Sequence, residues 1–559
     1  NEMKNPDNIT TYPLKLRMKR LRRDSDRWSL LTLLLVFFLA LPVISIAVKL
    51  FGKPGETWGH IVEHLLPDYI GNSLFLALVS GALVLAFGVT TAWLVARYEF
   101  PFRKQLQWLL ILPLAIPSYI SAYAYAGIFD YGGSMELLFR GLGWEFTRID
   151  IMNRGGLAFV LAISLFPYVY VSARAFFLNQ AGNLMEASKM LGVGEGRSFF
   201  RLILPLARPA IIAGLVLVLM EVLNDYGAAK YYGVSTFTTG IFRAWFSLEE
   251  PETAVYLSAI LMLLIFGLIL LEKWQSRHHR SSTSKANSAP LRRRMQSRWR
   301  RGTIFLIVLL PVLLGFFIPV LQLVYWAWLT AAEVFSPDFL MLSLQSFGIA
   351  LLTAVVTVLS AVLLIYFSKW SMLDSLRNIA RMGVLGYAIP GAVIAIGIMI
   401  PTLYFDKWLI GAAQRLFSMD PGLLLNGSLF ALVYAYCVRF LAVAFNPIEA
   451  TSMKVNRSIP DSSRMLGVGN LKTFFRIEYP LVKTGIFSAM ILVFVDVLKE
   501  LPLTLILKPF HVDTLAVKAY EYASDERVME AAIPSLFIVL TAVLPVIFLN
   551  RLLINRTSN

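Results

Sequence analysis

The sequence predicts an all-α polytopic membrane protein of about twelve transmembrane helices, arranged as two six-helix repeats of parallel orientation. Three observations predict this fold class. The 559 residues are 57% hydrophobic and only 15% charged, against roughly 25% charged residues in soluble domains. Apolar runs of about 20 residues, the length that crosses a bilayer, recur along the chain. The two halves of the chain also resemble each other in sequence.

Each apolar run predicts one crossing. The first, "WSLLTLLLVFFLALPVISIAVKL" from Trp28, is too long for a signal-peptide core and has no small-residue cleavage site, so it predicts a retained helix. The expected centres of the crossings lie near residues 39, 84, 117, 167, 218, 263, 316, 355, 390, 435, 492 and 540.

Lysine and arginine predict the orientation of the chain. The tail 1–27 contains "KLRMKRLRRDSDR", and such basic segments collect on the cytoplasmic side of a membrane. Alternation of the crossings then places the Ser-rich basic linker 274–301 and the tail 551–559 in the cytoplasm as well. The net charge of +16 is therefore interpreted as contact with the lipid bilayer and not as binding of nucleic acid. The linker divides the chain into a first half, 28–273, and a second half, 302–550.

The two halves align along much of their length. "LAIP" ending at Pro117 aligns with "YAIP" ending at Pro390, at an offset of 273 in the numbering. "EASKMLGVGEGRSFFRLILPL" from Glu186 aligns with "DSSRMLGVGNLKTFFRIEYPL" from Asp461, at an offset of 275. Because each half has an even number of crossings, the repeats share one orientation and are related by an axis along the membrane normal. A pathway through the protein is expected on that axis.

The second aligned pair, at about 179–207 and 447–482, predicts a short cytoplasmic helix in each half. Gly192 and Gly467 are suited to the left-handed residue that ends such a helix. A rigid helix that is presented twice favours a docking site for a twofold partner. The alternative is a helix that lies on the lipid surface, but that interpretation does not explain why both copies keep their glycines.

The start of each short helix is predicted by a capping box. Asn183 stands three positions before Glu186, and Ser458 precedes Asp461 by the same interval. In this arrangement the acidic residue reaches back to the amide of the capping residue.

These two segments resemble the EAA loop of ABC-importer permeases. Glutamate, alanine, glycine, leucine and proline stand at the motif positions of the first copy, in Glu186, Ala187, Gly192, Leu204 and Pro205. The second copy matches at Asp461, Gly467, Ile477 and Pro480; aspartate replaces glutamate, two serines replace the alanines and a tyrosine replaces the leucine.

In the ABC-importer family the loop forms a coupling helix that fits a cleft in the cytoplasmic ATPase. The resemblance therefore implies the type I permease fold and a cytoplasmic ATPase dimer as partner. It also implies an ATPase-coupling role for a set of residues in the two loops: Glu186, Ala187, Leu191, Gly192, Pro205, Asp461, Leu466, Gly467 and Pro480.

Hydrolysis of ATP is expected on a separate polypeptide. The sequence has no G-x-x-x-x-G-K-[ST] phosphate loop, so ATP and Mg²⁺ are expected on the partner ATPase, and the chain is not itself expected to be an enzyme. No permanently bound cofactor is expected. The single cysteine, Cys437, excludes disulfides and thiolate metal sites within one chain.

Acidic residues at membrane depth point to a pathway. Glu221 and Asp225 are spaced i and i+4 and share a helical face, and the second half carries Asp496 and Glu500 at the aligned positions. Charges in a membrane are costly and usually mark a pathway, and carboxylates suit a hard cation. The alternative is a structural ion pair, with Lys499 neutralising one of the acids.

The chain resembles the ferric-iron permeases among these importers, from about Trp28 to Leu549. The segments that carry this likeness are "EVLNDYGAAKYYGVSTFTTGIFRAWF" and "DVLKELPLTLILKPFHVDTLAVKAYEYAS". The resemblance implies a bacterial inner-membrane location, a periplasmic ferric-binding protein as partner, and a ferric ion as the substrate that passes Glu221 and Asp496. Tyr226, Tyr231 and Tyr232 are either further contacts of that ion or part of an aromatic belt.

Three alternative functions can be compared with ferric-iron import. Thiamine permeases are related and also fused, and thiamine is itself a cation that an aromatic cage would bind. An ion-coupled secondary transporter also has six-helix repeats, although it does not need two cytoplasmic docking helices. A membrane-embedded enzyme needs a catalytic cluster such as H-E-x-x-H, which the sequence lacks.

Overall fold

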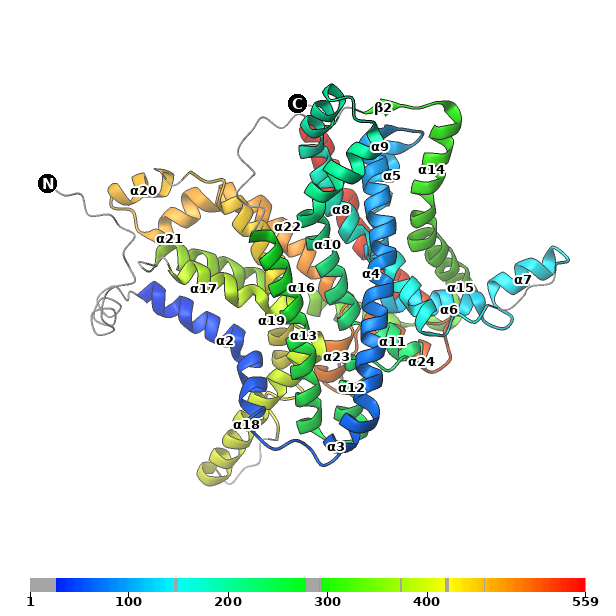
Figure 1. Cartoon of the computed structure of the whole chain (residues 1–559). Helices are drawn as coiled ribbons and strands as arrows, with labels where there is room; N and C mark the ends of the chain where they lie inside the picture. The colour runs from blue at the N-terminus through cyan, green and yellow to red at the C-terminus, as the bar shows by residue number, and fades with distance from the viewer. Residues whose placement is uncertain are drawn as a thin grey trace.

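The computed structural model of the chain describes residues 27–144, 149–277, 291, 293–371, 373, 375–417, 422–456 and 458–557. The predicted tail 1–27, apart from Arg27, lies outside the described residues, as do residues 278–290 and 292 of the predicted linker. The described part is built almost entirely of helices (Figure 1).

The first half contains α2 (Arg27–Lys49), α3 (Trp58–His60), η2 (Ile61–Leu65), α4 (Leu66–Arg97), β1 (Tyr98–Glu99), α5 (Arg103–Leu109), η3 (Leu112–Ala115), α6 (Ser118–Phe129), α7 (Ser134–Gly141), α8 (Arg154–Met190), α9 (Glu195–Ser198), η4 (Phe199–Ile203), α10 (Leu204–Asn224), α11 (Gly227–Tyr231), α12 (Phe237–Phe242), η5 (Arg243–Ser247) and α13 (Pro251–Arg277). The η segments are short 3₁₀ or π turns, most of which continue into a neighbouring α-helix.

The second half contains β2 (Arg294–Met295), α14 (Arg298–Val312), η6 (Leu313–Phe317), α15 (Ile318–Val334), α16 (Pro337–Trp370), α17 (Ser375–Gly383), η7 (Val384–Ala388), α18 (Gly391–Phe417), α19 (Leu429–Ser452), α20 (Ser458–Met465), α21 (Asn470–Thr473), η8 (Phe474–Glu478), α22 (Tyr479–Leu498), α23 (Pro502–Leu507), α24 (Leu515–Ser524) and α25 (Ala532–Thr557).

The membrane-spanning character of the fold is confirmed. Ten helical segments of the described chain are long and apolar enough to cross a bilayer: Arg27–Lys49, Trp58–Arg97, Arg154–Gly182, Glu195–Asn224, Pro251–Gln275, Arg298–Val334, Pro337–Trp370, Gly391–Leu416, Leu429–Ser452 and Asn470–Leu498. An eleventh candidate is a pair of helices bent by 93° between Ala115 and Ser118. The twelfth expected crossing, near residue 540, falls on α25, whose described apolar part is the shorter segment Ala532–Pro545.

The repeat extends to the helix boundaries. α4 ends at Arg97 and α16 ends at Trp370, which are related by the same offset as the two proline-containing segments. α8 begins at Arg154 and α19 begins at Leu429, which are related by the offset of the MLGVG segments. Each of these two helices is capped at its N-terminus by the side chain of the preceding residue. The halves therefore share one backbone plan, as the sequence alignment predicts.

The aligned proline pairs mark a break in each half and not the middle of a helix. Ile116 and Ile389 have extended backbones, with ψ angles of 117° and 132°, because a following proline disfavours the helical region. The crossing expected near residue 117 is thus a broken helix, and the one expected near 390 is interrupted at the same place before α18 begins.

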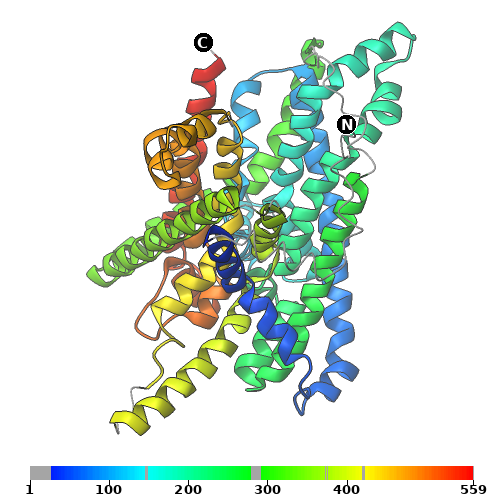
Figure 2. The same ribbon diagram turned by 90° about the vertical axis from the view of Figure 1, so that its left-hand side faces the viewer.

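Both halves turn their duplicated segments toward one end of the molecule. Figure 2 shows the end of α8 with α9 on one side and α20 with α21 on the other, both in the part of the molecule toward the C-terminus. α3 and the end of α18 lie at the opposite end (Figure 2).

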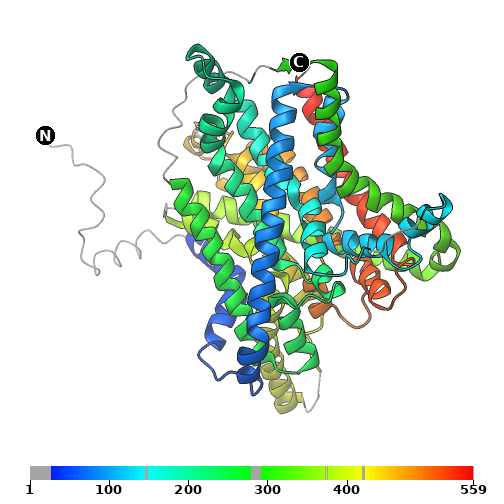
Figure 3. The same cartoon turned by 45° about the vertical axis from the view of Figure 1, so that its right-hand side comes forward.

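The first helix of each half packs on the other half, which the sequence analysis did not anticipate. α2 contacts α16, α17 and α18, and Trp28 packs against Phe367 and Trp370 with ring centroids 5.3 and 4.8 Å apart. Conversely, α14 and α15 run beside α4, α5 and α6 (Figure 3). At Gly315 in η6, an added methyl group would lie 2.6 Å from the carbonyl oxygen of Ile163 in α8.

The end of the linker is docked on the first half. β2 forms a parallel pair with β1, with Tyr98 opposite Arg294. Arg294 also forms an ion pair of 3.0 Å with Glu195, which Arg97 contacts from the end of α4. The linker therefore reaches the segment that follows the first MLGVG sequence.

The crossed packing predicts that Gly315→Ala destabilises the protein while Gly302→Ala does not. The Gly315 methyl group has no room, and overpacking of this kind costs about 1–3 kcal/mol. Gly302 lies on the same helical stretch with no atom within 4 Å, so alanine there should be neutral or slightly stabilising. Thermal unfolding of the purified protein in detergent measures both effects. Equal midpoints for the two variants would contradict the close packing of α8 on η6.

Candidate functional site

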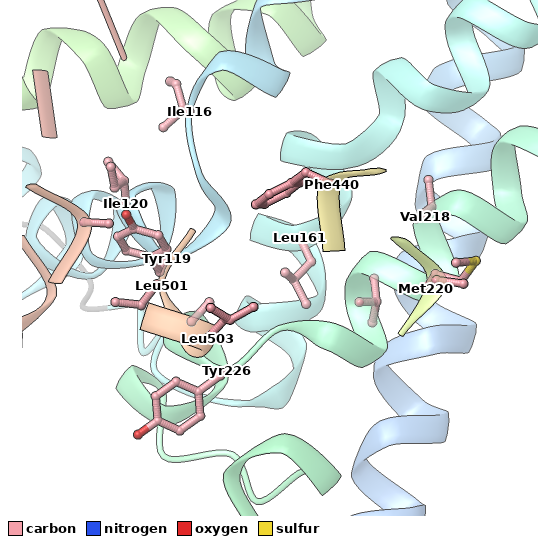
Figure 4. Packing of buried hydrophobic residues seen from close by; sticks show 14 of the residues in the cluster. Ile116, Tyr119, Ile120, Leu161, Val218, Met220, Tyr226, Phe440, Leu501 and Leu503 are labelled. Carbon is pink, nitrogen blue, oxygen red and sulfur yellow. The ribbon is translucent and has the colours of Figure 1, made fainter. Parts of the chain in front are cut away.

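A cavity of about 140 Å³ lies between the two halves. Its walls come from the broken span before α6, from α8 and from the junction of α10 and α11 in the first half. The second half contributes η7, α19 and the junction of α22 and α23. Figure 4 shows Phe440 and Leu501 of the second half lying among Tyr119, Leu161 and Tyr226 of the first.

All four acidic residues expected on the pathway line this cavity: Glu221, Asp225, Asp496 and Glu500. They form two pairs at the repeat offset of 275, Glu221 with Asp496 and Asp225 with Glu500. Nevertheless, within the described residues there is no group of three or more His, Cys, Asp or Glu side chains that is placed to hold a metal ion. The carboxylates share a cavity without converging on one point.

Asp225 and Glu500 hold the starts of two short helices. Asp225 accepts a hydrogen bond of 3.0 Å from the amide of Ala229 in α11, and another from the hydroxyl of Ser118. Glu500 accepts one of 3.1 Å from the amide of Leu503 in α23. Both carboxylates therefore supply partners to backbone amides that would otherwise be unpaired in the first turn of a helix.

Arg439 is a further charged residue of the cavity that the sequence analysis missed. Its Nε lies 3.1 Å from Glu500, and its guanidinium donates a hydrogen bond of 3.1 Å to the carbonyl of Ile389 at the break before α18. Gly391 allows this approach, because an added methyl group would lie 2.6 Å from Glu500. A lone arginine in the apolar run "YCVRFLAVAF" is the signal that could have revealed it.

Asp496 and Glu221 differ in their partners. Asp496 forms an ion pair of 2.9 Å with Lys499, the residue directly after the end of α22, which is the structural alternative considered above. Glu221 accepts a hydrogen bond of 3.3 Å from the hydroxyl of Tyr387, across the boundary between the halves, and forms no salt bridge with any described residue.

Of the three tyrosines considered as ion contacts, only Tyr226 lines the cavity. Its ring stacks on Phe242 with centroids 3.6 Å apart. The Tyr232 hydroxyl donates to the carbonyl of Ala122 at 3.1 Å, and Tyr231 lines a separate pocket beside α15.

The end of the first duplicated helix has the predicted geometry. Gly192 has a φ of +70°. Its amide donates a hydrogen bond of 3.0 Å to the carbonyl of Lys189, and the amide of Val193 donates one of 3.0 Å to the carbonyl of Ser188. Together the two bonds form a Schellman motif. In the second copy Gly467 has a φ of +76°, and the amide of Val468 bonds to the carbonyl of Ser463 at 3.1 Å.

The predicted start of the first duplicated helix is wrong. α8 runs without a break from Arg154 to Met190, so Asn183 is an interior residue of this helix and not its N-terminal capping residue. In the second copy a separate helix, α20, does begin at Ser458, where the side chain of Asn456 accepts a hydrogen bond from the Ser458 amide.

A proline explains why the two copies differ. Pro460 lies in the first turn of α20, a position where proline is tolerated because the amide has no helical partner, and proline disfavours a helix that runs through it. The aligned residue of the first copy is Met185, which allows α8 to continue. The prediction failed because the capping spacing alone does not determine whether the preceding helix has ended.

The tips of both copies expose large apolar side chains at aligned positions. Leu191 is 81% exposed and Leu466 is 83% exposed, and each follows an exposed methionine, Met190 or Met465. Glu186, Ala187 and Asp461 are exposed as well, and so is Pro480, whereas Pro205 is partly buried. Exposed apolar groups that recur at one end of a protein are typical of an interaction surface.

Comparison with known proteins agrees with this two-part arrangement. Residues 85–275 and 375–559 each match the family described as "Binding-protein-dependent transport system inner membrane component". A Fe(3+)-transport system permease protein of Haemophilus influenzae is 26% identical over 87% of this chain and 90% of its own length. The sulfate transport system permease protein CysT of Escherichia coli is 26% identical over 44% of this chain and 91% of its own length.

Removal of one partner of the Arg439–Glu500 pair is expected to destabilise the protein. Arg439→Leu leaves a buried carboxylate without its cation, which typically costs about 3–5 kcal/mol. The double variant Arg439→Leu/Glu500→Gln should recover part of that loss, since the amide oxygen still accepts from Leu503. Thermal unfolding of both variants measures the difference. As a control, Arg527→Leu breaks an ion pair with Glu530 on the exposed surface and should change little. A double variant no more stable than Arg439→Leu would rule out the pair as the cause.

Proposed function

Because this chain belongs to the family of binding-protein-dependent transport system inner membrane components, we propose that it is the permease subunit of an ATP-driven importer of ferric iron. It is a multi-pass inner-membrane protein. In this proposal a periplasmic binding protein delivers the ion to the outer face, and a cytoplasmic ATPase dimer supplies the energy.

The charge of the cavity between the halves supports ferric iron as the substrate. Four carboxylates line it against two basic side chains, Arg439 and Lys499, so its charge favours a cation. Oxygen ligands of this kind suit a hard ion. The Haemophilus influenzae relative, which matches most of the chain, is named as a Fe(3+)-transport permease and supports the same choice.

Size favours an ion over thiamine. Pockets that hold organic ligands typically measure about 300–1,000 Å³, and the cavity here is about 140 Å³.

Sulfate is the second candidate. Relatives named as sulfate permeases match single halves of the chain, and the two basic side chains of the cavity would suit an anion. Both bases are paired with acids, however: Arg439 with Glu500 and Lys499 with Asp496. An anion would have to displace these acids, whereas a cation meets Glu221 without a competing salt bridge.

The two exposed tips are the proposed contacts of the ATPase dimer. Glu186, Ala187 and Leu191 in the first half, and Asp461 and Leu466 in the second, lie on the surface at one end of the molecule. Gly192 and Gly467 set the shape of the tips. Two tips that are related by pseudo-twofold symmetry fit two ATPase subunits. An ion-coupled secondary transporter, the alternative of another class, would need neither tip.

Transport by alternating access follows from this arrangement. Binding of ATP and Mg²⁺ on the partner closes the ATPase dimer and draws the two tips together. The halves then open outward and receive the ferric ion, which passes Glu221 and Asp496 when the ATPase resets. The termini and the linker are placed in the cytoplasm in this scheme, and the chain itself binds no permanent cofactor.

Uptake of radiolabelled ferric iron tests the substrate, with labelled sulfate and thiamine in parallel. Cells carry this permease with its ATPase and binding protein. Iron uptake is expected, and Glu221→Gln/Asp496→Asn should lower it by at least about tenfold if each carboxylate contributes a charge-assisted contact. Co-purification with the ATPase should be unchanged in the variant. Uptake of sulfate or thiamine without uptake of iron would show that the proposed substrate is wrong, while the proposal of an ATP-driven importer would stand.

Coupling is tested at the two tip glycines. Valine at Gly192 and Gly467 is strained by about 1–2 kcal/mol per residue in the left-handed region, so it should distort both tips. Coupling energies between sites are typically about 1–3 kcal/mol, and loss of such coupling corresponds to about 5-fold to 150-fold. Ferric uptake should fall by that order, while the protein stays folded. The matched control is valine at Gly194 and Gly469, which have equally open surroundings but φ angles of −63° and −66°. Equal uptake by the two double variants would show that the tips do not couple.

A further inference from the structure

The first-half wall of the central cavity carries buried polar atoms that have no protein partner. Ser164, Asn224 and Tyr119 all line the cavity, with exposed fractions of 2%, 6% and 5%. In the part of the chain that the structure describes, no hydrogen-bond partner lies within reach of Ser164 Oγ, Asn224 Oδ1 or the Tyr119 hydroxyl. Most buried polar atoms in proteins have a partner, and leaving one without costs about 1–3 kcal/mol. Three such atoms around one cavity indicate that something in the cavity serves them.

The second-half wall is different at the aligned positions. Arg439 stands where the first half has Ser164, and Lys499 stands where it has Asn224, both at the offset of 275. Each of these cations is tied to a carboxylate, at 3.1 Å to Glu500 and 2.9 Å to Asp496. This wall therefore neutralises its own charge, whereas the first-half wall does not.

Two of the three unpartnered atoms, those of Asn224 and Ser164, lie on elements next to Glu221. Glu221 and Asn224 are spaced i and i+3 on α10 and share a helical face. Ser164 is on α8, which packs directly against α10. A carboxylate, an amide oxygen and a hydroxyl form an all-oxygen set, which suits a hard cation.

We propose that the transported cation is held on the first-half wall, by Glu221, Asn224 and Ser164, and that Arg439 and Lys499 close the second-half wall as built-in counter-cations. This inference rests on the proposed function and assigns its cargo contacts to one half. The pseudo-twofold cavity is thus used asymmetrically. A cation that enters it is held by the wall with unpartnered oxygen atoms, while Asp496 and Glu500 already have cationic partners.

Reciprocal exchange of the aligned residues tests the proposal. Ferric uptake and ATP hydrolysis stimulated by the binding protein are measured with the full importer for Asn224→Lys and for Lys499→Asn. Asn224→Lys places a cation beside Glu221, and uptake should fall by about tenfold or more, as expected when a contact to a charged group is replaced by repulsion. Lys499→Asn should keep most of the uptake. Equal losses in the two variants would contradict the asymmetric use of the walls.

Alanine variants separate cargo contact from packing. Ser164→Ala and Asn224→Ala should each lower ferric uptake several-fold, with stimulated ATP hydrolysis retained. The matched controls are Ser258→Ala and Gln322→Ala, whose side chains are buried with unpartnered atoms as well, but away from the cavity. Losses of similar size in the controls would overturn the assignment, because they would show that any buried polar atom matters equally.

Uptake by the wild type distinguishes a failure of the proposed function from a failure of the assignment of the cation to the first-half wall. If it imports no ferric iron, the proposed function is wrong. If it imports iron and the Ser164 and Asn224 variants import it equally well, the proposed function stands, the assignment of the wall is wrong, and water alone serves the unpartnered atoms.

Discussion

A buried ion pair between Arg439 and Glu500 connects two interruptions of helix in the second half, the break at Ile389 and the start of α23, and both lie beside the cavity. Backbone groups within a bilayer must find partners inside the protein, so a broken span is tolerated only where it is buried in protein or lines a cavity. At the break, the carbonyl of Ile389 accepts a hydrogen bond from the guanidinium of Arg439. In the first turn of α23, the amide of Leu503 donates a hydrogen bond to the carboxylate of Glu500. The position of the central cavity follows, because breaks in both halves have to face each other there and not the lipid.

In the first half, hydrogen bonds alone, without an ion pair among the described residues, provide partners for the backbone at the interruption of helix beside the cavity. Asp225 takes the place of Glu500 and pairs with the hydroxyl of Ser118 and the amide of Ala229, with no arginine at the position aligned with Arg439. The shared backbone plan was therefore retained while the side chains diverged. Duplication supplies two walls of one shape. Divergence then paired the cations of the second-half wall with carboxylates and left unpartnered oxygen atoms on the first-half wall. The asymmetry of the cavity is a property of side chains on a nearly symmetric frame.

Much of this arrangement could be predicted from the sequence, because it depends on local patterns. Apolar runs predict the spans, the offset of 275 predicts the repeat, and Gly192 and Gly467 predict helix ends that are confirmed by their positive φ angles. What could not be predicted depends on distant contacts. Nothing local shows that α2 packs on the second half, since an apolar helix fits lipid and protein equally. The break before α20 depends on Pro460, which the capping pattern does not include, and Arg439 is aligned with an uncharged serine, Ser164, so the pattern of paired acids does not reveal it.

Because α8 is continuous, it connects the cavity mechanically to the exposed tip of the first half. One helix carries Ser164 at the cavity and ends at the tip that bears Leu191, about 40 Å further on at a rise of about 1.5 Å per residue. Pro167 lies within it close to Ser164, and proline is where helices bend, so a push on the tip is expected to bend α8 beside the cavity. In the second half the tip is on α20, which is separated from α19 and therefore from Arg439. In the proposed importer, movement of an ATPase subunit would thus reach the first-half wall directly and the second-half wall through a break. The wall with free oxygen atoms is also the wall with the unbroken connection to the tip, which is the combination that a cargo-releasing stroke requires.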